Sequence, residues 1–146
     1  MENIDIDIDL DPQILCLSSL GFVLPILFYI FYREYTHAYT FLAMLILSNA
    51  IASILFWKDA ERYSFFHRID AILARISFIC CLGFILLFKT MTPFSLFLLG
   101  MILGKVGFYL YLSNEYSCKE WCCPEHIYHH LLFHLSIPAG LTFCFL

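Results

Sequence analysis

Five long apolar runs, separated by short breaks that carry charge or proline, dominate the pattern of hydrophobic and polar positions along the chain. A transmembrane helix needs about 20 mainly apolar residues to cross the hydrocarbon of a bilayer. The runs predict spans at about 13–32, 38–57, 69–88, 93–112 and 126–146. We therefore expect an all-α fold, a polytopic transmembrane helix bundle of about five spans in a single domain.

The composition supports the same class of protein. Hydrophobic residues make up 62% of the 146 positions and charged residues only 14%, whereas about 25% of a typical soluble domain is charged. Such a chain cannot cover itself with polar surface, so we expect an integral, multi-pass membrane protein whose first partner is the lipid bilayer. No basic cluster of the kind that binds nucleic acid is present in the sequence, and we expect no nucleic-acid partner.

The first twelve residues, MENIDIDIDLDP, carry acidic side chains and no basic one. We interpret residues 1–12 as an acidic, disordered leader. A cleaved signal peptide would begin with a basic segment and a short apolar core, so the leader also argues against such a peptide.

Lysine and arginine in the short loops indicate the orientation, because cytoplasmic loops are enriched in them. The loops after the second and fourth spans together hold four of these residues, and those after the first and third hold two, which favours an N-terminus inside. In any five-span serpentine, the loops after spans two and four lie on the same membrane face. The basic residues counted are Lys58, Arg62, Arg68 and Lys119 against Arg33 and Lys89.

Polar residues that could bind a metal or take part in catalysis concentrate at that same face. Ser53 lies late in the second span, His67 and Asp70 lie at the start of the third, and the fifth span begins with several histidines. A rise of 1.5 Å per residue places Ser53, His130 and His134 roughly 6–13 Å below the surface. These side chains are therefore expected to be able to share one pocket.

The histidines at 126, 130 and 134 recur every four residues, which places them along one face of a helix. Zinc sites commonly use two or three neutral imidazoles with a carboxylate or water, so His126, His130 and His134 are candidate ligands. The alternative is that histidines at a membrane interface serve only as amphipathic anchors. In that case the chain is a non-enzymatic structural or interaction protein of the membrane.

The string HHLLFHLSIPAGL, which contains His130 and His134, resembles the last helix of the CREST superfamily. This group of membrane hydrolase-like proteins includes the alkaline ceramidases and the adiponectin-receptor-like proteins. Its members place a serine late in their second helix and an aspartate near the start of their third, and Ser53 and Asp70 match these. The likeness covers about 48–75 and 126–141. It departs at Trp57, where the family has a zinc-binding histidine, and in having about five spans where the family has seven.

The resemblance implies a zinc ion held by His130 and His134, with His67 or His126 as the third ligand. It further implies that Asp70 positions a metal-bound water or takes its proton, while Ser53 steadies an oxyanion. The substrate would be an amide or ester bond in a lipid. Trp57, in place of the family's histidine, leaves a degenerate or non-catalytic descendant as an alternative.

Three further features carry weaker hypotheses. Lys105 lies inside the fourth span, where a charge is costly, so we predict that it faces protein, towards Asp70, and not lipid. The alternative is that its side chain snorkels to the interface. A transport role is suggested only by this lysine. Gly100 and Gly104 form a GxxxG motif, which we interpret as packing of this span inside the bundle.

Cys118 and Cys122 extend the fourfold spacing into His126 and His130. A Cys2His2 metal site is therefore a further alternative. Pro124 argues against it, because proline interrupts the helix that would align the four side chains.

Overall fold

The computed structural model describes residues 11–32 and 36–145. In this part of the chain every regular element is a helix, so the predicted all-α class is confirmed. Of the expected leader only Asp11 and Pro12 are described, and the rest of it lies outside the described residues. The elements are α1 (Ile14–Ser19), the 3-10 helix η1 (Leu20–Val23), α2 (Leu24–Tyr32), α3 (His37–Asp59), α4 (Phe65–Phe88), α5 (Pro93–Lys119) and α6 (Pro124–Phe145).

Four helical stretches are long and apolar enough to cross a membrane. They are Ile14–Phe31, which combines α1, η1 and α2, and the helices α3, α4 and α5. The helix α6 is 22 residues long, which is length enough for a span. Its four histidines and its internal proline lower its hydropathy, and it is not among the four.

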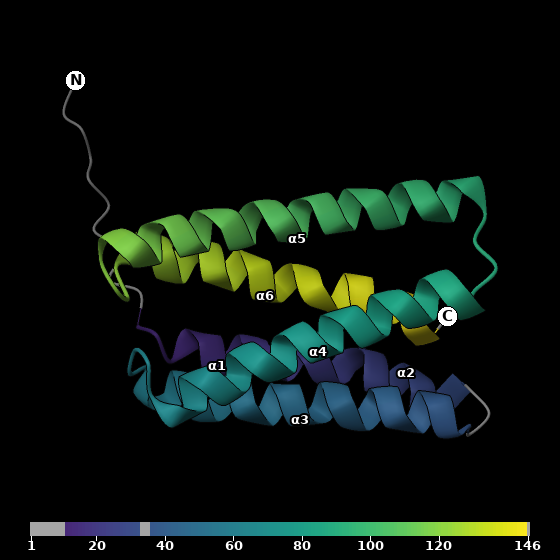
Figure 1. Ribbon diagram of the computed structural model, residues 1–146, viewed down its shortest axis with the longest axis horizontal. Helices are drawn as coiled ribbons and strands as arrows, with labels where there is room; N and C mark the ends of the chain where they lie inside the picture. The colour runs from purple at the N-terminus through teal and green to yellow at the C-terminus, as the bar shows by residue number, and fades with distance from the viewer. Residues whose placement is uncertain (1–10, 33–35, 146) are drawn as a thin grey trace.

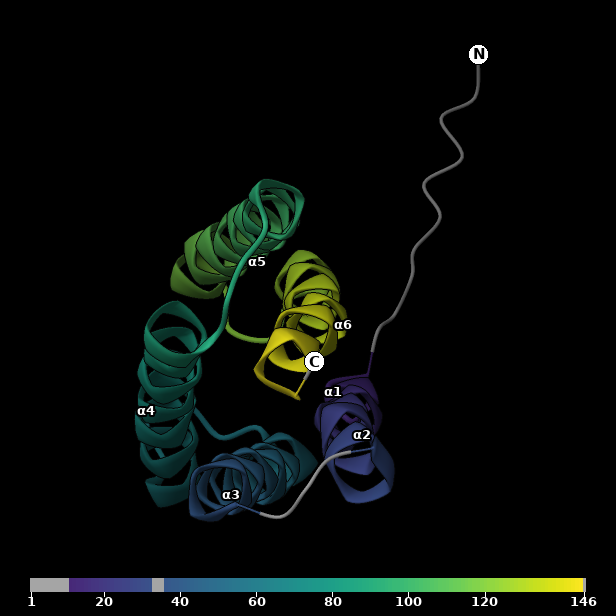
Figure 2. The ribbon, with the colours of Figure 1, turned by 90° about the vertical axis from the view of Figure 1, so that its right-hand side faces the viewer.

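The helices lie side by side along the long axis of the molecule (Figure 1). Viewed end-on, α6 lies inside an arc formed by the others (Figure 2). It packs against α5, against the α1–η1–α2 rod and against α4, while α3 packs against α4 and the rod. The consecutive helices α4 and α5 pack mainly against α3 and α6, respectively, and not against each other.

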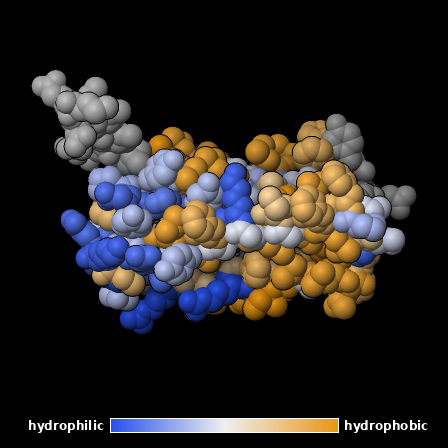
Figure 3. Space-filling view, turned by 90° about the horizontal axis from the view of Figure 1, so that it is seen from above, coloured by the Kyte–Doolittle hydropathy of each residue, from blue (hydrophilic) through white to orange (hydrophobic). Residues whose placement is uncertain are grey.

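The loops after α3 and α5 meet at one end of the bundle, as the sequence predicted. The indole Nε1–H of Trp121 donates a hydrogen bond to the carbonyl of Ala60 at 2.7 Å. The guanidinium of Arg62 lies 5.4 Å from the centre of the Trp121 ring. Hydrophilic side chains gather at this end and apolar ones cover the other (Figure 3).

Hydroxyl caps explain where three of the helices begin. The side chains of Thr36, Ser64 and Thr92 accept hydrogen bonds from the backbone N–H three residues further on, which satisfies donors that a helix N-terminus leaves free. The Ser64 cap starts α4 at Phe65, four residues before the predicted start. The helix α5 ends later than predicted, because it continues to Lys119 through residues that we had expected in a loop. An ion pair of 3.1 Å between Glu115 and Lys119 lies on this last turn.

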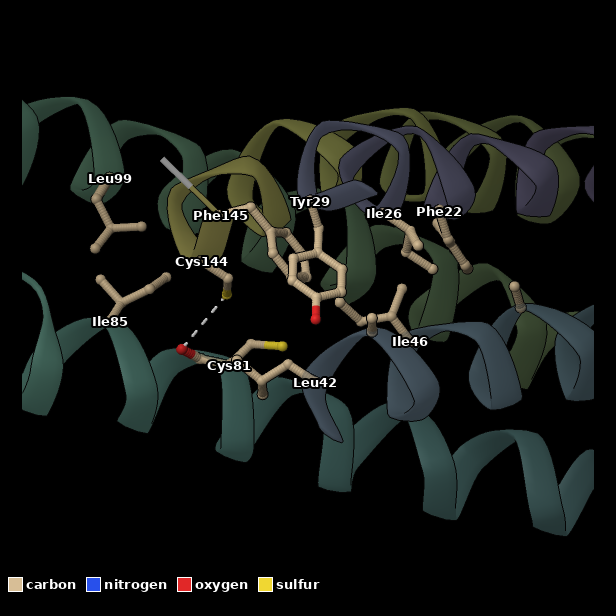
Figure 4. Close-up of a cluster of buried hydrophobic side chains, with 12 residues drawn as sticks. Phe22, Ile26, Tyr29, Leu42, Ile46, Cys81, Ile85, Leu99, Cys144 and Phe145 are labelled. Carbon is tan, nitrogen blue, oxygen red and sulfur yellow. Dashed lines mark hydrogen bonds between the residues drawn. The ribbon is translucent and has the colours of Figure 1, made fainter. Parts of the chain in front are cut away.

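A cluster of buried apolar side chains joins the helices (Figure 4). Its side chains come from every long helix, and the thiol of Cys144 on α6 contacts the carbonyl oxygen of Cys81 on α4 at 3.7 Å. This core fixes the C-terminal half of α6 between the rod, α3 and α4. Its members include Phe22, Ile26, Leu42, Ile46, Cys81, Ile85, Leu99, Cys144 and Phe145.

Two expectations for the fourth span are wrong. Lys105 is exposed, and its Nζ lies 5.8 Å from the ring centre of Tyr109 on its own helix, so it does not face the interior or Asp70. A Cβ built at Gly100 or Gly104 would meet nothing within 4 Å. The glycine motif therefore does not mediate close packing against any described part of the bundle, because α5 contacts α6 through a different face.

The meeting of the two polar loops makes a topological prediction. In a cysteine-free background, Arg62→Cys and Lys119→Cys should both react with a membrane-impermeant maleimide added to the same side of sealed vesicles. Reaction from opposite sides would contradict the arrangement. Intact labelling of each cysteine after detergent lysis is the control.

Candidate functional site

A cavity of about 910 Å³ lies between α3, α4, α5 and α6. Its size is at the upper end of the range usual for small-molecule sites. Small residues line it where α4 and α5 approach, namely Ala71, Ala74 and Gly107, and a Cβ at Gly107 would meet nothing within 4 Å. These small side chains leave the space between the two helices unfilled at this level.

Polar side chains gather at the end of the cavity near the loops. Ser53, Asp70, His126, His130 and His134 all line it, so the structure brings the predicted residues to one cavity. His67 lines the cavity as well. The rest of the wall is mainly apolar.

The three histidines of α6 form a ladder along one face, one helical turn apart. The ring centres of His126 and His130 lie 5.8 Å apart, and those of His130 and His134 lie 4.8 Å apart. His126 and His134 are buried, and His130 is half-buried. The fourfold spacing in the sequence therefore gives the predicted row of imidazoles.

Serines from two other helices hold the inner pair of histidines. The Nδ1 atom of His134 lies 2.8 Å from the hydroxyl of Ser18, and that hydroxyl donates to the carbonyl of Leu15. When the Ser18 hydroxyl donates to Leu15, His134 Nδ1 carries the hydrogen and Nε2 has a lone pair. The Nδ1 atom of His130 lies 2.8 Å from the hydroxyl of Ser113. When Ser113 accepts, His130 also has a free Nε2 lone pair, the form that binds metals or protons.

His67 and His126, the two candidates for a third metal ligand, accept hydrogen bonds at Nδ1. His126 Nδ1 accepts the backbone N–H of Cys122 at 3.1 Å, and His67 Nδ1 accepts that of Tyr63 at 2.9 Å. An imidazole that accepts at Nδ1 carries its hydrogen on Nε2 when neutral. Both rings therefore hold loop backbone, and their Nε2 atoms are not free to coordinate a metal.

A serine on the first helical rod lies between the histidine ladder and Ser53. Ser19 Oγ donates to the carbonyl of Leu15 at 2.7 Å, and it lies 3.0 Å from Ser53 Oγ and 3.5 Å from His134 Nδ1. Ser53 also interacts with the side chain of Asp70 on α4. Polar side chains thus follow one another from α6 through α1 and α3 to α4.

Trp57 occupies the space beside the histidine pair. Its ring centre lies 4.7 Å from that of His130 and 6.4 Å from that of His134, and the side chain is 1% exposed. It also stacks nearly parallel to Trp121, at 6.3 Å. A buried indole, and not an imidazole, therefore lies beside the His130–His134 pair.

The described residues contain no group of three His, Cys, Asp or Glu side chains arranged to hold a metal ion. This agrees with the hydrogen bonds, which leave His130 and His134 as the histidines with available Nε2 atoms. Two imidazoles fall short of the ligand set of a zinc site. The donor set does not fit a tightly bound zinc ion.

Ser18, Ser19 and Ser113 support the site and were not predicted from the sequence. A signal was available, because Ser18 and Ser19 interrupt an apolar run at the depth of the histidines. Polar groups within hydrocarbon must find internal partners. Hydrogen bonds between these serines and the histidines of the last span could therefore have been predicted from the sequence.

The cysteines next to the site serve the loop. Cys123 Sγ accepts the backbone N–H of His126 at 3.4 Å, while Cys118 is exposed at the end of α5. The alternative Cys2His2 site is thus not formed among the described residues, in keeping with the break at Pro124, where α6 begins.

Comparisons with known proteins found no matching family model, no curated relative and no similar solved structure.

Packing of the loop makes a prediction about thiol reactivity. Burial, and secondly Cys123, raises the pKa of the Cys122 thiol to about 11. Because the thiolate is the reactive form, Cys122 should react slowly with iodoacetamide at pH 7 and progressively faster as the pH approaches 11. Peptide mass spectrometry follows this reaction, and exposed Cys118 should be alkylated before Cys122 at neutral pH. Faster labelling of Cys122 at pH 7 would contradict the packing.

Proposed function

We propose that this chain is a five-span membrane protein that binds an amphiphilic lipid in its central cavity. We further propose that it is a degenerate relative of the zinc-dependent lipid amide and ester hydrolases. The observation that carries the proposal is the large, mainly apolar cavity whose one polar end holds Ser53, Asp70, His130 and His134. A cavity of this composition suits a molecule with an apolar chain and a polar head.

The fifth span in this proposal is α6. The helix packs against α5, the α1–η1–α2 rod and α4. This supports the assignment, because polar side chains that face neighbouring helices can be paired there and need not meet lipid. Its histidines then lie at the membrane interior, paired with protein groups. The excess of lysine and arginine after α3 and α5 supports an inside N-terminus.

The polar end offers hydrogen-bonding groups to a lipid head. The Nε2 lone pairs of His130 and His134 can accept a proton or a hydrogen bond, while the Ser53–Asp70 pair supplies a further hydroxyl and carboxyl. These groups can orient a polar head. Trp57 supports a role in binding over one in hydrolysis, because it fills the place of a ligand on which a tight zinc site would depend.

A second candidate is a non-enzymatic structural or interaction protein. The observation that favours it is the use of His67 and His126 to hold loop backbone, with aromatic stacking around both rings. On this reading the polar end is an anchor at the membrane interface. Lipid binding inside the cavity separates the two candidates, since an anchor requires none.

The state of the metal site can be tested by restoring the missing ligand. Wild type should purify with substoichiometric zinc, because two imidazoles bind weakly, whereas Trp57→His should raise the zinc content towards one ion per chain. Combining Trp57→His with His134→Ala should remove the gain. Elemental analysis of protein purified without chelators measures this.

Trp57→Phe is the matched control, because it keeps an aromatic side chain in the core without adding a ligand. Truncation to alanine is unsuitable, since loss of a buried tryptophan costs about 3–5 kcal/mol. Stoichiometric zinc in wild type, lost in His67→Ala or His126→Ala, would contradict the degenerate site and indicate an intact metal centre.

A further inference from the structure

Asn49 and Ser77 lie deeper in the bundle than the histidine end of the cavity. Asn49 precedes Ser53 by one turn on the same face of α3, and Ser77 follows Asp70 by two turns on the same face of α4. At 1.5 Å per residue these offsets are about 6 Å and about 10 Å. Both residues line the large cavity.

Both residues carry a buried polar atom without a partner. Asn49 is 9% exposed and Ser77 is 5% exposed. The Asn49 Oδ1 and the Ser77 Oγ atoms accept or donate no hydrogen bond among the described residues. Three of the four such atoms in this part of the chain belong to residues that line the cavity, the third being Trp57 Nε1.

Other hydroxyls in these helices behave differently. Ser48, Ser136 and Thr142 each donate to the carbonyl four residues earlier on their own helix, at 2.7–2.8 Å, which is the usual solution for a hydroxyl within a helix. Ser77 does not use it. An unpartnered buried group costs about 1–3 kcal/mol, so two such groups beside one cavity call for a partner that comes from outside the protein.

The surroundings define what that partner must look like. The wall near Asn49 and Ser77 is apolar and includes Ile46, Phe78 and Leu103. Phe78 and Leu103 also line a second, smaller apolar cavity of about 60 Å³, which continues towards Leu99. A bound molecule would therefore present a polar group at this depth and continue as hydrocarbon beyond it.

We propose that Asn49 and Ser77 form a second polar subsite, which hydrogen-bonds a hydroxyl group carried part-way along the apolar chain of the bound amphiphile. This inference rests on the proposed lipid-binding function and adds the chemical class of ligand. The polar head lies at the histidine end, the hydroxyl lies between α3 and α4, and the tail extends towards the smaller cavity. The carboxamide and the serine hydroxyl together can both donate to and accept from one ligand hydroxyl.

The two tryptophans of the chain, Trp57 and Trp121, both line the cavity, so their fluorescence reports what fills it. Purified full-length protein in nanodiscs is titrated with stearic acid and with hydroxystearic acids that carry the hydroxyl at successive chain positions. We expect one or a few adjacent positions to bind about 5- to 10-fold more tightly than stearic acid, the effect of about one or two net hydrogen bonds.

Ser77→Ala and Asn49→Leu should abolish that preference while both still bind stearic acid. Ser48→Ala is the matched control, because Ser48 is exposed on the same helix as Asn49 and bonds its own backbone; it should keep the preference. Ser77→Ala removes only a hydroxyl, so it remains informative if Asn49→Leu folds poorly by circular dichroism.

The outcomes separate the two proposals. Binding of all probes with equal affinity, or a preference that survives both substitutions, would overturn the subsite and indicate that water alone satisfies the two groups. Failure of wild type to bind any probe would overturn the lipid-binding function and the subsite together. The titration measures lipid binding and not zinc content, so its result can be interpreted whether or not the histidines bind zinc.

Discussion

The arrangement of the bundle depends on pairing the polar groups that α6 buries against its neighbours. His126 and His134 are buried and His130 is half-buried, and an unpaired buried polar group costs about 1–3 kcal/mol. Ser18 on α1 and Ser113 on α5 supply partners for His134 and His130. Because the two serines come from opposite ends of the sequence, α1 and α5 must both lie against α6, and α3 and α4 are left to close the remaining side.

That closure is incomplete, and the incompleteness is what gives the protein a cavity. α4 is held by α3 and by the C-terminal half of α6, where the core is dense. Nearer the loops, Ala71 and Ala74 on α4 and Gly107 on α5 line the cavity, and a Cβ at Gly107 would meet nothing within 4 Å. The same small residues in a soluble domain would allow collapse, but here the helix ends are already tied by Trp121 and Ala60.

Apolar run length predicted the helices well, because hydrocarbon thickness imposes it directly. It could not predict that α5 extends to Lys119 or that α4 begins at Phe65, since those turns are polar or interfacial and depend on the Ser64 cap and on local ion pairing. Lys105 was misplaced for a related reason. Depth along a helix can be counted from sequence, but the face that a neighbour covers depends on packing, and α5 presents another face to α6.

The candidate site was predicted as a set of residues but not as a set of roles. Spacing placed His126, His130 and His134 in one row, yet it assigned them the same chemistry. Hydrogen bonding divides them: the backbone N–H of Cys122 fixes His126 as a structural ring, whereas the inner two rings pair through Nδ1 with serine hydroxyls, which can accept and so allow a lone pair on Nε2. Only contacts between distant segments could reveal this.

Trp57 shows how one position shifts the balance between chemistry and binding. An imidazole there would lie beside His130 and His134 as a third metal ligand. The indole instead packs against the rings of His130 and Trp121 and contributes mainly apolar area. Its buried Nε1–H has no acceptor in the described structure, although a buried indole usually finds one. A donor aimed at no protein group, next to two imidazoles with free lone pairs, leaves both kinds of hydrogen-bonding capacity at the polar end unused. Under the proposed function, a head group that both accepts and donates satisfies them together, which a metal ion in the same place could not do.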